Sequence, residues 1–173
     1  SLQSNASKNK KAEIKLGKVD PPQEKIKFLT DLYEKGDLQN ALKAAENLLK
    51  TFPNSIVLYN LCGAAHAGLH QYEKAIEYYQ NAININPDFA EAYNNMGISL
   101  RNKGDYNQAI KSYQKAIKIN PNFANAYNNL GNVYYELGKL DDALMYYEKA
   151  LVLKPRYAKA LNNIGNIQRD KNK

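Results

Sequence analysis

The sequence lacks tryptophan and has one cysteine and two methionines among 173 residues. The single cysteine, Cys62, excludes an intramolecular disulfide framework. No apolar run approaches the roughly 20 residues of a transmembrane helix, and the polar N-terminus shows no signal peptide. We therefore expect a cytoplasmic location and no membrane partner. Tyrosine occurs 14 times, so much of the core must consist of rings whose hydroxyl groups need water or a hydrogen-bond partner.

The middle of the chain lacks a net positive charge, although the formal net charge of the whole chain is +7. Residues 1–20 carry five basic and two acidic residues, and residues 154–173 carry six and one. The thirteen basic and fourteen acidic residues between them give a net charge of −1, against +3 and +5 at the ends. No basic face of the kind that binds phosphates crosses the middle, so we expect no nucleic-acid partner.

The first 21 residues differ from the rest of the chain. Residues 1–6, SLQSNA, lack an initiator methionine and are typical of an expression-tag remnant. Residues 7–21 are rich in lysine and aperiodic, and they end at the first residue of the proline pair Pro21–Pro22. This composition predicts a flexible basic lead-in.

A period of 34 residues organises everything that follows. Prolines and glycines recur at this spacing, together with a tyrosine and two alanines in each of three units. The recurring residues are Pro53, Pro87, Pro121 and Pro155; Gly63, Gly97, Gly131 and Gly165; Tyr79, Tyr113 and Tyr147; Ala75, Ala109 and Ala143; Ala82, Ala116 and Ala150.

Each unit is predicted to form two antiparallel helices. Apolar residues three and four apart precede a turn such as LGKL, and a second such run stops before the proline. Asp88 and Asn122, directly after their prolines, are candidate N-caps. The glycine of the first helix and the alanine of the second, such as Gly131 and Ala143, allow close approach. One pair cannot bury its apolar face alone, so the units must stack into a solenoid.

The pattern Tyr-x2-Leu-Gly-x2-Tyr, followed by Ala-x3-Tyr and Pro, resembles the tetratricopeptide repeat (TPR). This resemblance implies an all-α, right-handed solenoid of four TPRs and a C-terminal capping or half-repeat helix. Leu29, where a small residue is expected opposite Ala41, predicts looser packing in the first unit. The predicted units are residues 22–55, 56–89, 90–123 and 124–157, with the C-terminal helix in 158–173.

The asparagine pairs can be placed by their helical angle. We number positions within a unit from Ile56, Ala90, Ala124 and Ala158. At 100° per residue, positions 2, 5, 6, 9, 12 and 13 lie opposite the core positions 4, 7, 8 and 11. The asparagines are therefore expected to face away from the core. They are Asn60, Asn94, Asn95, Asn125, Asn128, Asn129, Asn132, Asn162, Asn163 and Asn166.

An amide side chain offers a donor and an acceptor together, so a row of them can pair with the backbone of an extended peptide. The row is similar to the asparagine ladder in the TPR domains of O-linked N-acetylglucosamine transferases, which implies a peptide-binding concave groove. Leu61 at its apolar end and Tyr135 at its edge are further candidate peptide-binding residues. The alternative left open is that asparagine occupies an exposed helix face in a lineage rich in Asn, Ile and Lys.

Other sites have weaker support in the sequence. The five positions of the carboxylate clamp that binds chaperone tails match only in part, which disfavours a chaperone co-factor. Cys62 and His66 occupy core positions and His70 replaces a turn glycine, so we expect packing and no metal site. No catalytic set or phosphate loop is present, and we expect no cofactor and no catalysis by the segment itself.

The last 16 residues keep the apolar pattern of a full repeat at Leu161, Ile164, Gly165 and Ile167. Without a second helix, part of this face is expected to be exposed. We expect either a chain cut from a longer protein or end-to-end self-association. The main functional hypothesis is a protein- or peptide-binding scaffold, and the alternative is a substrate-targeting module of a larger enzyme such as a glycosyltransferase or sulfotransferase.

Overall fold

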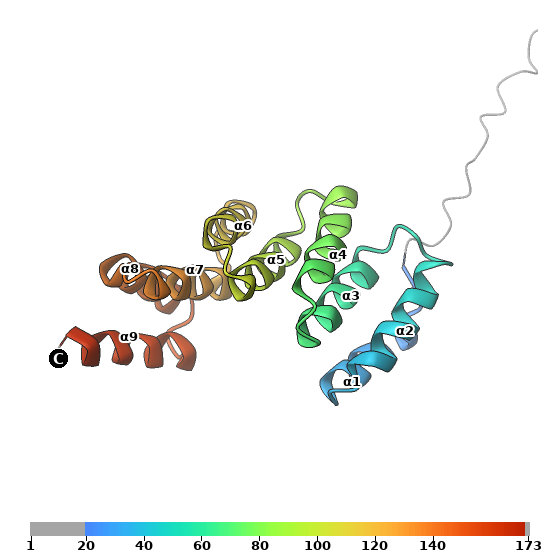
Figure 1. Cartoon of the computed structure of the whole chain (residues 1–173), viewed down its shortest axis with the longest axis horizontal. Helices are drawn as coiled ribbons and strands as arrows, with labels where there is room; N and C mark the ends of the chain where they lie inside the picture. The colour runs from blue at the N-terminus through green and yellow to red at the C-terminus, as the bar shows by residue number, and fades with distance from the viewer. Residues whose placement is uncertain (1–19, 172–173) are drawn as a thin grey trace, which may run out of the picture.

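The computed structural model describes residues 20–171, which form nine α-helices and contain no β-strand within that range. The helices lie side by side in an elongated array that runs from α1 to α9 (Figure 1). This confirms the all-α helical repeat fold. The tag remnant and most of the lead-in lie outside the described residues. The helices are α1 (Gln23–Glu34), α2 (Leu38–Leu49), α3 (Ile56–Gly68), α4 (Tyr72–Ile85), α5 (Ala90–Lys103), α6 (Tyr106–Ile119), α7 (Ala124–Glu136), α8 (Leu140–Leu153) and α9 (Ala158–Lys171).

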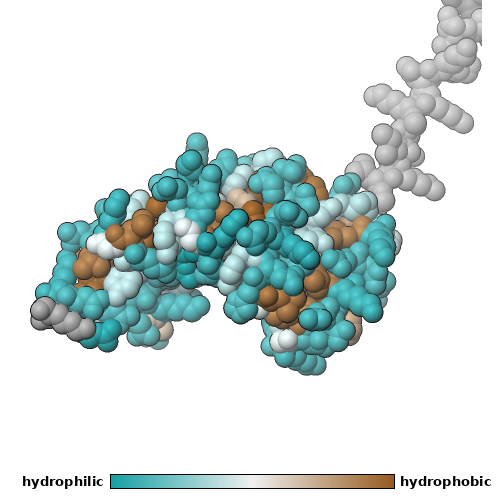
Figure 2. Space-filling model, in the orientation of Figure 1, coloured by the Kyte–Doolittle hydropathy of each residue, from teal (hydrophilic) through white to brown (hydrophobic). Residues whose placement is uncertain are grey.

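Contacts between helices define an inner side of the array. Each odd-numbered helix from α1 to α7 packs against the even-numbered helix that follows it, and each even-numbered helix packs against the next odd-numbered one. The odd-numbered helices also contact one another, whereas the even-numbered helices do not within residues 20–171. Elements on the inside of a curved stack lie closer together, so the odd-numbered helices form the inner side. Figure 2 shows the lower edge of the molecule hollowed between its two ends.

Tyrosine rings lie directly on the glycines of the odd-numbered helices. A Cβ atom added at Gly63, Gly97 or Gly131 would lie 2.6, 2.7 or 2.6 Å from the ring of the tyrosine in the following helix. Only glycine leaves room for these rings, which are Tyr79, Tyr113 and Tyr147 and are almost completely buried. The ring therefore fills the contact between the two helices of one unit. The first unit has Leu29 instead, buried in its own core cluster, and α1 packs less extensively on α2, as Leu29 predicts.

The turn inside each unit needs a left-handed residue. Gly36, Gly104 and Gly138 have positive φ angles, and His70 takes the equivalent place with φ 58°. His70 thus replaces the turn glycine, as the sequence predicts. The predicted caps Asp88 and Asn122 are wrong: α5 and α7 begin one residue later.

The cause of this shift lies in the preceding turn. The side-chain oxygens of Asn86 and Asn120 accept the backbone N–H of Asp88 and Asn122 at 3.1 Å. This hydrogen bond holds residue 88 or 122 inside the turn, so Phe89 or the corresponding Phe123 takes the cap position without a side-chain bond. Within residues 20–171, no helix combines the length and apolar character required to cross a bilayer.

Candidate functional site

Asparagine side chains connect the odd-numbered helices through a hydrogen bond that recurs in every step from α3 to α9. Position 6 of each unit donates from Nδ2 to the Oδ1 atom at position 5 of the unit before. The three bonds join Asn95 to Asn60 (3.1 Å), Asn129 to Asn94 (3.0 Å) and Asn163 to Asn128 (3.2 Å). We call these six residues the asparagine seam.

The two seam positions differ in exposure. Asn94 and Asn128 at position 5 are only 6 % and 2 % exposed, so the expectation that both members of a pair face away from the core is wrong for them. The seam bond satisfies the buried amide carbonyls of Asn94 and Asn128, whereas Asn60 at the same position is half-buried. At position 6, Asn95, Asn129 and Asn163 remain half-buried, so part of each residue is accessible.

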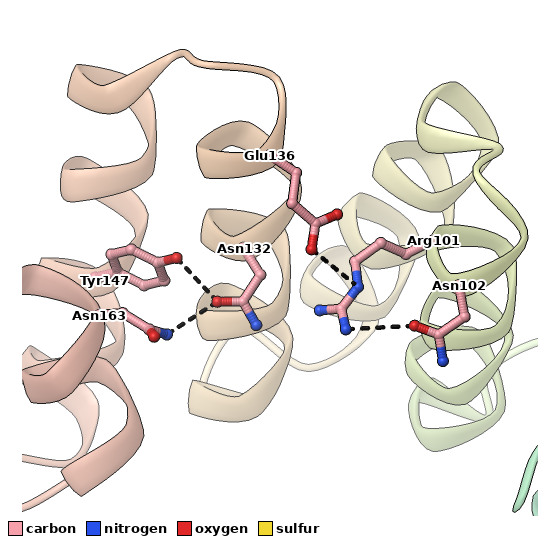
Figure 3. Close-up of polar contacts among 6 residues, drawn as sticks. All are labelled: Arg101, Asn102, Asn132, Glu136, Tyr147 and Asn163. Atoms are coloured by element: carbon pink, nitrogen blue, oxygen red, sulfur yellow. Dashed lines mark hydrogen bonds and ion pairs between the residues drawn. The ribbon is translucent and has the colours of Figure 1, made fainter. Parts of the chain in front are cut away.

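Asn132 at position 9 connects the seam with the core of the fourth unit through hydrogen bonds. Its Oδ1 atom accepts from the Tyr147 hydroxyl at 2.9 Å and from Nδ2 of Asn163 at 2.9 Å (Figure 3). A carbonyl oxygen has two lone pairs, and this one uses both. Burial of Tyr147 raises its pKa, so the ring stays protonated and donates at neutral pH.

The third unit lacks this arrangement because position 9 is Ile98. The equivalent tyrosine, Tyr113, is fully buried, and its hydroxyl has no hydrogen-bond partner within residues 20–171. An unpaired buried hydroxyl costs free energy that the Tyr147–Asn132 bond avoids. Burial raises the pKa of Tyr113 as well.

Charged residues lie on the inner side beside the seam. The Arg101 Nε atom is 3.7 Å from Glu136 Oε1, so α5 and α7 are joined by an ion pair as well as by asparagine (Figure 3). The Tyr135 hydroxyl donates to Asp170 Oδ2 at 2.6 Å, and this bond to a carboxylate raises the tyrosine pKa. The sequence prediction omitted Arg101, Glu136 and Asp170, although positions 12 and 13 share the helical angle that identified the asparagines.

The other predicted site residues lie outside the seam. Asn125 and Asn162 are exposed. Asn166 is half-buried and accepts from Arg169 at 3.1 Å. Leu61 is half-buried against the core cluster of the first two units, so the apolar end of the inner side is partly shared with the core.

The cysteine and histidines of α3 have packing roles. Cys62 is fully buried, and burial raises the pKa of its thiol to about 12. His66 is buried, lies 2.7 Å from Gln71 Oε1 through Nδ1, and stacks on the Tyr78 ring with 5.1 Å between centroids. In the described range, no three His, Cys, Asp or Glu side chains are grouped to hold a metal ion.

Family models match the chain in several segments. A TPR repeat model matches residues 69–102 and 99–138, and tetratricopeptide repeat models match residues 124–157 and 29–55. The comparison with curated proteins gives no match.

Solved structures share the fold. The crystal structure of MamA is 30 % identical in sequence, with a TM-score of 0.72 over 83 % of this chain and 84 % of that one. PilF of Pseudomonas aeruginosa is 20 % identical, with a TM-score of 0.79 over 86 % of this chain and 68 % of that one. The first TPR of Spaghetti (RPAP3), bound to the HSP90 peptide SRMEEVD, is 21 % identical, with a TM-score of 0.64 over 68 % and 94 %.

Proposed function

Because this chain belongs to the tetratricopeptide-repeat family, we propose that it is a scaffold that binds an extended segment of another protein on its inner side. Solenoid proteins bind on their concave surfaces, and the first TPR of Spaghetti (RPAP3), which has a similar fold, is bound to the HSP90 peptide SRMEEVD. The proposal gives the segment a binding role and no catalytic one. Whether it serves a larger enzyme stays a separate prediction.

The exposed part of position 6 carries the proposal. Asn129 uses one of its two N–H groups for the seam bond to Asn94, so a second N–H and a carbonyl oxygen remain available. Asn95 likewise keeps a second N–H, and one lone pair of its Oδ1 atom, because Asn94 Nδ2 donates to the other at 3.2 Å. Asn163 donates to both Asn128 and Asn132, so it offers its carbonyl oxygen. A peptide backbone presents N–H and C=O groups in alternation, so the row can hold an extended segment largely independently of its side chains.

The seam bonds reduce the side-chain entropy that is lost when a peptide binds. An asparagine that rotates freely must be ordered when it binds a ligand, at a cost of about 0.5–1.5 kcal/mol per side chain. Here the seam orders the amide before the ligand arrives. The buried residues Asn94 and Asn128 therefore support the site without touching the ligand.

Two variants on either side of one seam bond test this assignment. Asn129→Ala and Asn94→Ala both remove the 3.0 Å bond between α5 and α7, but Asn94 is buried and Asn129 is partly accessible. We expect Asn129→Ala to reduce binding to a library of extended peptides at least about fivefold more than Asn94→Ala does. Equal losses would show that the asparagines only hold the helices together.

The exposed residue Asn107 of α6, which lies on an even-numbered helix and outside the seam, provides the control. Asn107→Ala should leave peptide binding within about twofold of the original protein. Circular dichroism at 222 nm must show equal helicity in all variants. Failure of the unchanged protein to bind any peptide in the library would contradict the proposed function itself.

A further inference from the structure

A cleft of about 620 Å³ lies between α2 and α4, and part of α3 contributes to its lining. In Figure 1, α3 lies between α2 and α4, and α1 and α5 continue the array on either side. We call this surface the α2–α4 cleft. It contains no residue of the asparagine seam. Its polar and aromatic lining residues are Glu46, Lys50, Tyr59, Glu77, Tyr78 and Asn81.

Two aromatic rings line the cleft side by side. The ring centroids of Tyr59 and Tyr78 are 6.2 Å apart, with 45° between the ring planes. The Tyr78 ring stacks on His66, and its hydroxyl donates to Glu46 Oε1 at 2.9 Å. Burial and this bond to a carboxylate raise the pKa of Tyr78, so the hydroxyl stays a donor at neutral pH. The faces of such rings are electron-rich and attract cations.

The ring equivalent to Tyr59 contacts a lysine of its own chain in the third unit. Lys115 Nζ lies 5.9 Å from the ring centroid of Tyr93. One repeat earlier, Tyr59 takes the place of this ring and Asn81 takes the place of the lysine. An amide carries no net charge for the ring to attract, so the pair in the cleft lacks its cation.

The fourth unit shows the same contact at the other ring. Lys149, one repeat after Lys115, lies with its Nζ atom 5.5 Å from the ring centroid of Tyr146, which occupies the repeat position of Tyr78. Within residues 20–171, no lysine or arginine lies over either ring of the α2–α4 cleft. The cleft thus contains both kinds of ring and neither lysine.

The charges in the cleft favour a cation at the place of the missing lysine. Glu46 and Glu77 both line it, and Glu77 makes no ion pair in the described range. Lys50 is the one basic residue of the lining, and its Nζ donates to Asn47 Oδ1 at 3.1 Å. Neither acidic position is acidic again in the next two repeats, where the residues are Gln80 and Lys111, then Gln114 and Met145. A cationic group of a partner is therefore attracted to this cleft.

We propose that the α2–α4 cleft binds a lysine side chain of a partner protein, with its ammonium group over the ring of Tyr59 and paired with Glu77. The partner supplies from outside the cation that Lys115 and Lys149 supply within the chain. The apolar stem of the lysine packs along the tyrosine rings. This surface is separate from the inner side, and its role does not rest on the proposed function.

A short lysine peptide tests the proposal on the whole chain. The probe is acetyl-Gly-Lys-Gly-amide, and acetyl-Gly-norleucine-Gly-amide is its uncharged counterpart of similar length. NMR chemical shifts of the 15N-labelled protein detect the weak binding of a single side chain. We expect the lysine probe to shift the signals of Tyr78 and Asn81 saturably and to bind at least about fivefold more tightly than the norleucine probe.

Asn81→Lys restores the lysine of the repeat and is the matched variant of the protein. Asn81 is exposed, and lysine favours helix over asparagine, so the fold is retained. We expect at least about fivefold weaker binding of the lysine probe, because the chain's own ammonium group occupies the cleft. Asn107→Lys adds the same charge to an exposed position of α6 outside the cleft and should change binding less than about twofold.

Three results would overturn the proposal. They are equal binding of the lysine and norleucine probes, equal effects of Asn81→Lys and Asn107→Lys, and no saturable shift at the cleft of the unchanged protein. The first would identify an apolar occupant, and the second a general effect of charge. Lysine binding that persists in Asn129→Ala would show that the cleft acts separately from the inner side.

Discussion

At the scale of single residues, Tyr113 and Tyr147 show how one position can stabilise one unit and weaken another. Both rings fill the same kind of space beside a glycine. The Tyr147 hydroxyl is bonded to Asn132, whereas the Tyr113 hydroxyl is buried without a partner among the described residues. The difference follows from one substitution at position 9, where Ile98 replaces asparagine.

We predict that Tyr147→Phe lowers the free energy of unfolding by about 1 kcal/mol, because a buried hydrogen bond is lost. Tyr113→Phe removes an unpaired hydroxyl and should be neutral or stabilising by up to about 1 kcal/mol. Urea denaturation followed by circular dichroism measures both values. Equal destabilisation by the two substitutions would mean that Tyr113 has a partner, such as a buried water.

His70 carries backbone strain that the other turns avoid. Its φ of 58° is costly for a residue with a Cβ atom, and its contact with the Tyr72 hydroxyl at 2.8 Å is exposed. We predict that His70→Gly raises the free energy of unfolding by about 0.5–1 kcal/mol, after allowance for the greater entropy of unfolded glycine. The same denaturation assay applies.

Gly138, with φ 73° in the equivalent turn of the fourth unit, provides the reverse test. Gly138→Ala should destabilise the protein by a similar amount. A stabilising effect there would show that the left-handed turn does not control stability.

At the scale of helices, the packing of a tyrosine on glycine determines how closely two helices of a unit approach. We predict that Gly97→Ala destabilises the protein by about 1–3 kcal/mol, because the added methyl group would lie 2.7 Å from Tyr113. Gly165→Ala adds the same group to an open surface and should stabilise by up to about 1 kcal/mol through helix propensity. Thermal unfolding of both variants against the original chain gives the comparison. Effects of the same sign would contradict the role of the tyrosine ring.

The sequence predicted the helices better than it predicted the contacts between them. The 34-residue period and the helical spacing of apolar residues were enough to predict paired helices. The absence of glycine at position 70 was enough to place His70 in the turn. The angle calculation failed for Asn94 and Asn128 because it treats each helix alone. It does not include the next odd-numbered helix, which supplies the seam bond.

The same limit explains the wrong caps and the omitted charges. Asp88 has a favourable side chain for a cap, but the preceding Asn86 already bonds its backbone N–H. Arg101 and Glu136 lie 35 residues apart and come together only when α5 stacks on α7. The residue pattern within one unit does not show which side chains of neighbouring units meet. Comparison of equivalent positions in neighbouring units predicts some of these contacts.

At the scale of the whole molecule, stability depends on contacts between neighbouring units, and a buried tyrosine joins the two helices of the second, third and fourth units. Burial raises the pKa values of Tyr79, Tyr113 and Tyr147 above their ordinary value. Burial of Cys62 raises the pKa of its thiol to about 12. All four groups are therefore more difficult to ionise in the folded chain than in the unfolded chain.

This linkage predicts unfolding in alkali. The folded state keeps its tyrosine protons, whereas unfolded tyrosines lose theirs above about pH 10. The contribution of the tyrosines is therefore complete below that pH and decreases as the pH rises, by about 1.4 kcal/mol per pH unit for each group. The Cys62 thiol adds a similar loss that begins near pH 8.5, the ordinary pKa of an unfolded cysteine. Three tyrosines together lower the free energy of unfolding by about 4 kcal/mol per unit, which is a large part of the 5–15 kcal/mol typical of a domain.

We expect the helices to unfold cooperatively between about pH 11 and 12. Ellipticity at 222 nm and tyrosinate absorbance at 295 nm should both report this transition, preceded by ionisation of the exposed tyrosines alone. Tyr113→Phe removes one of the linked groups and should move the midpoint to higher pH. Full ionisation of all 14 tyrosines with unchanged ellipticity would show that the buried rings do not hold the array together.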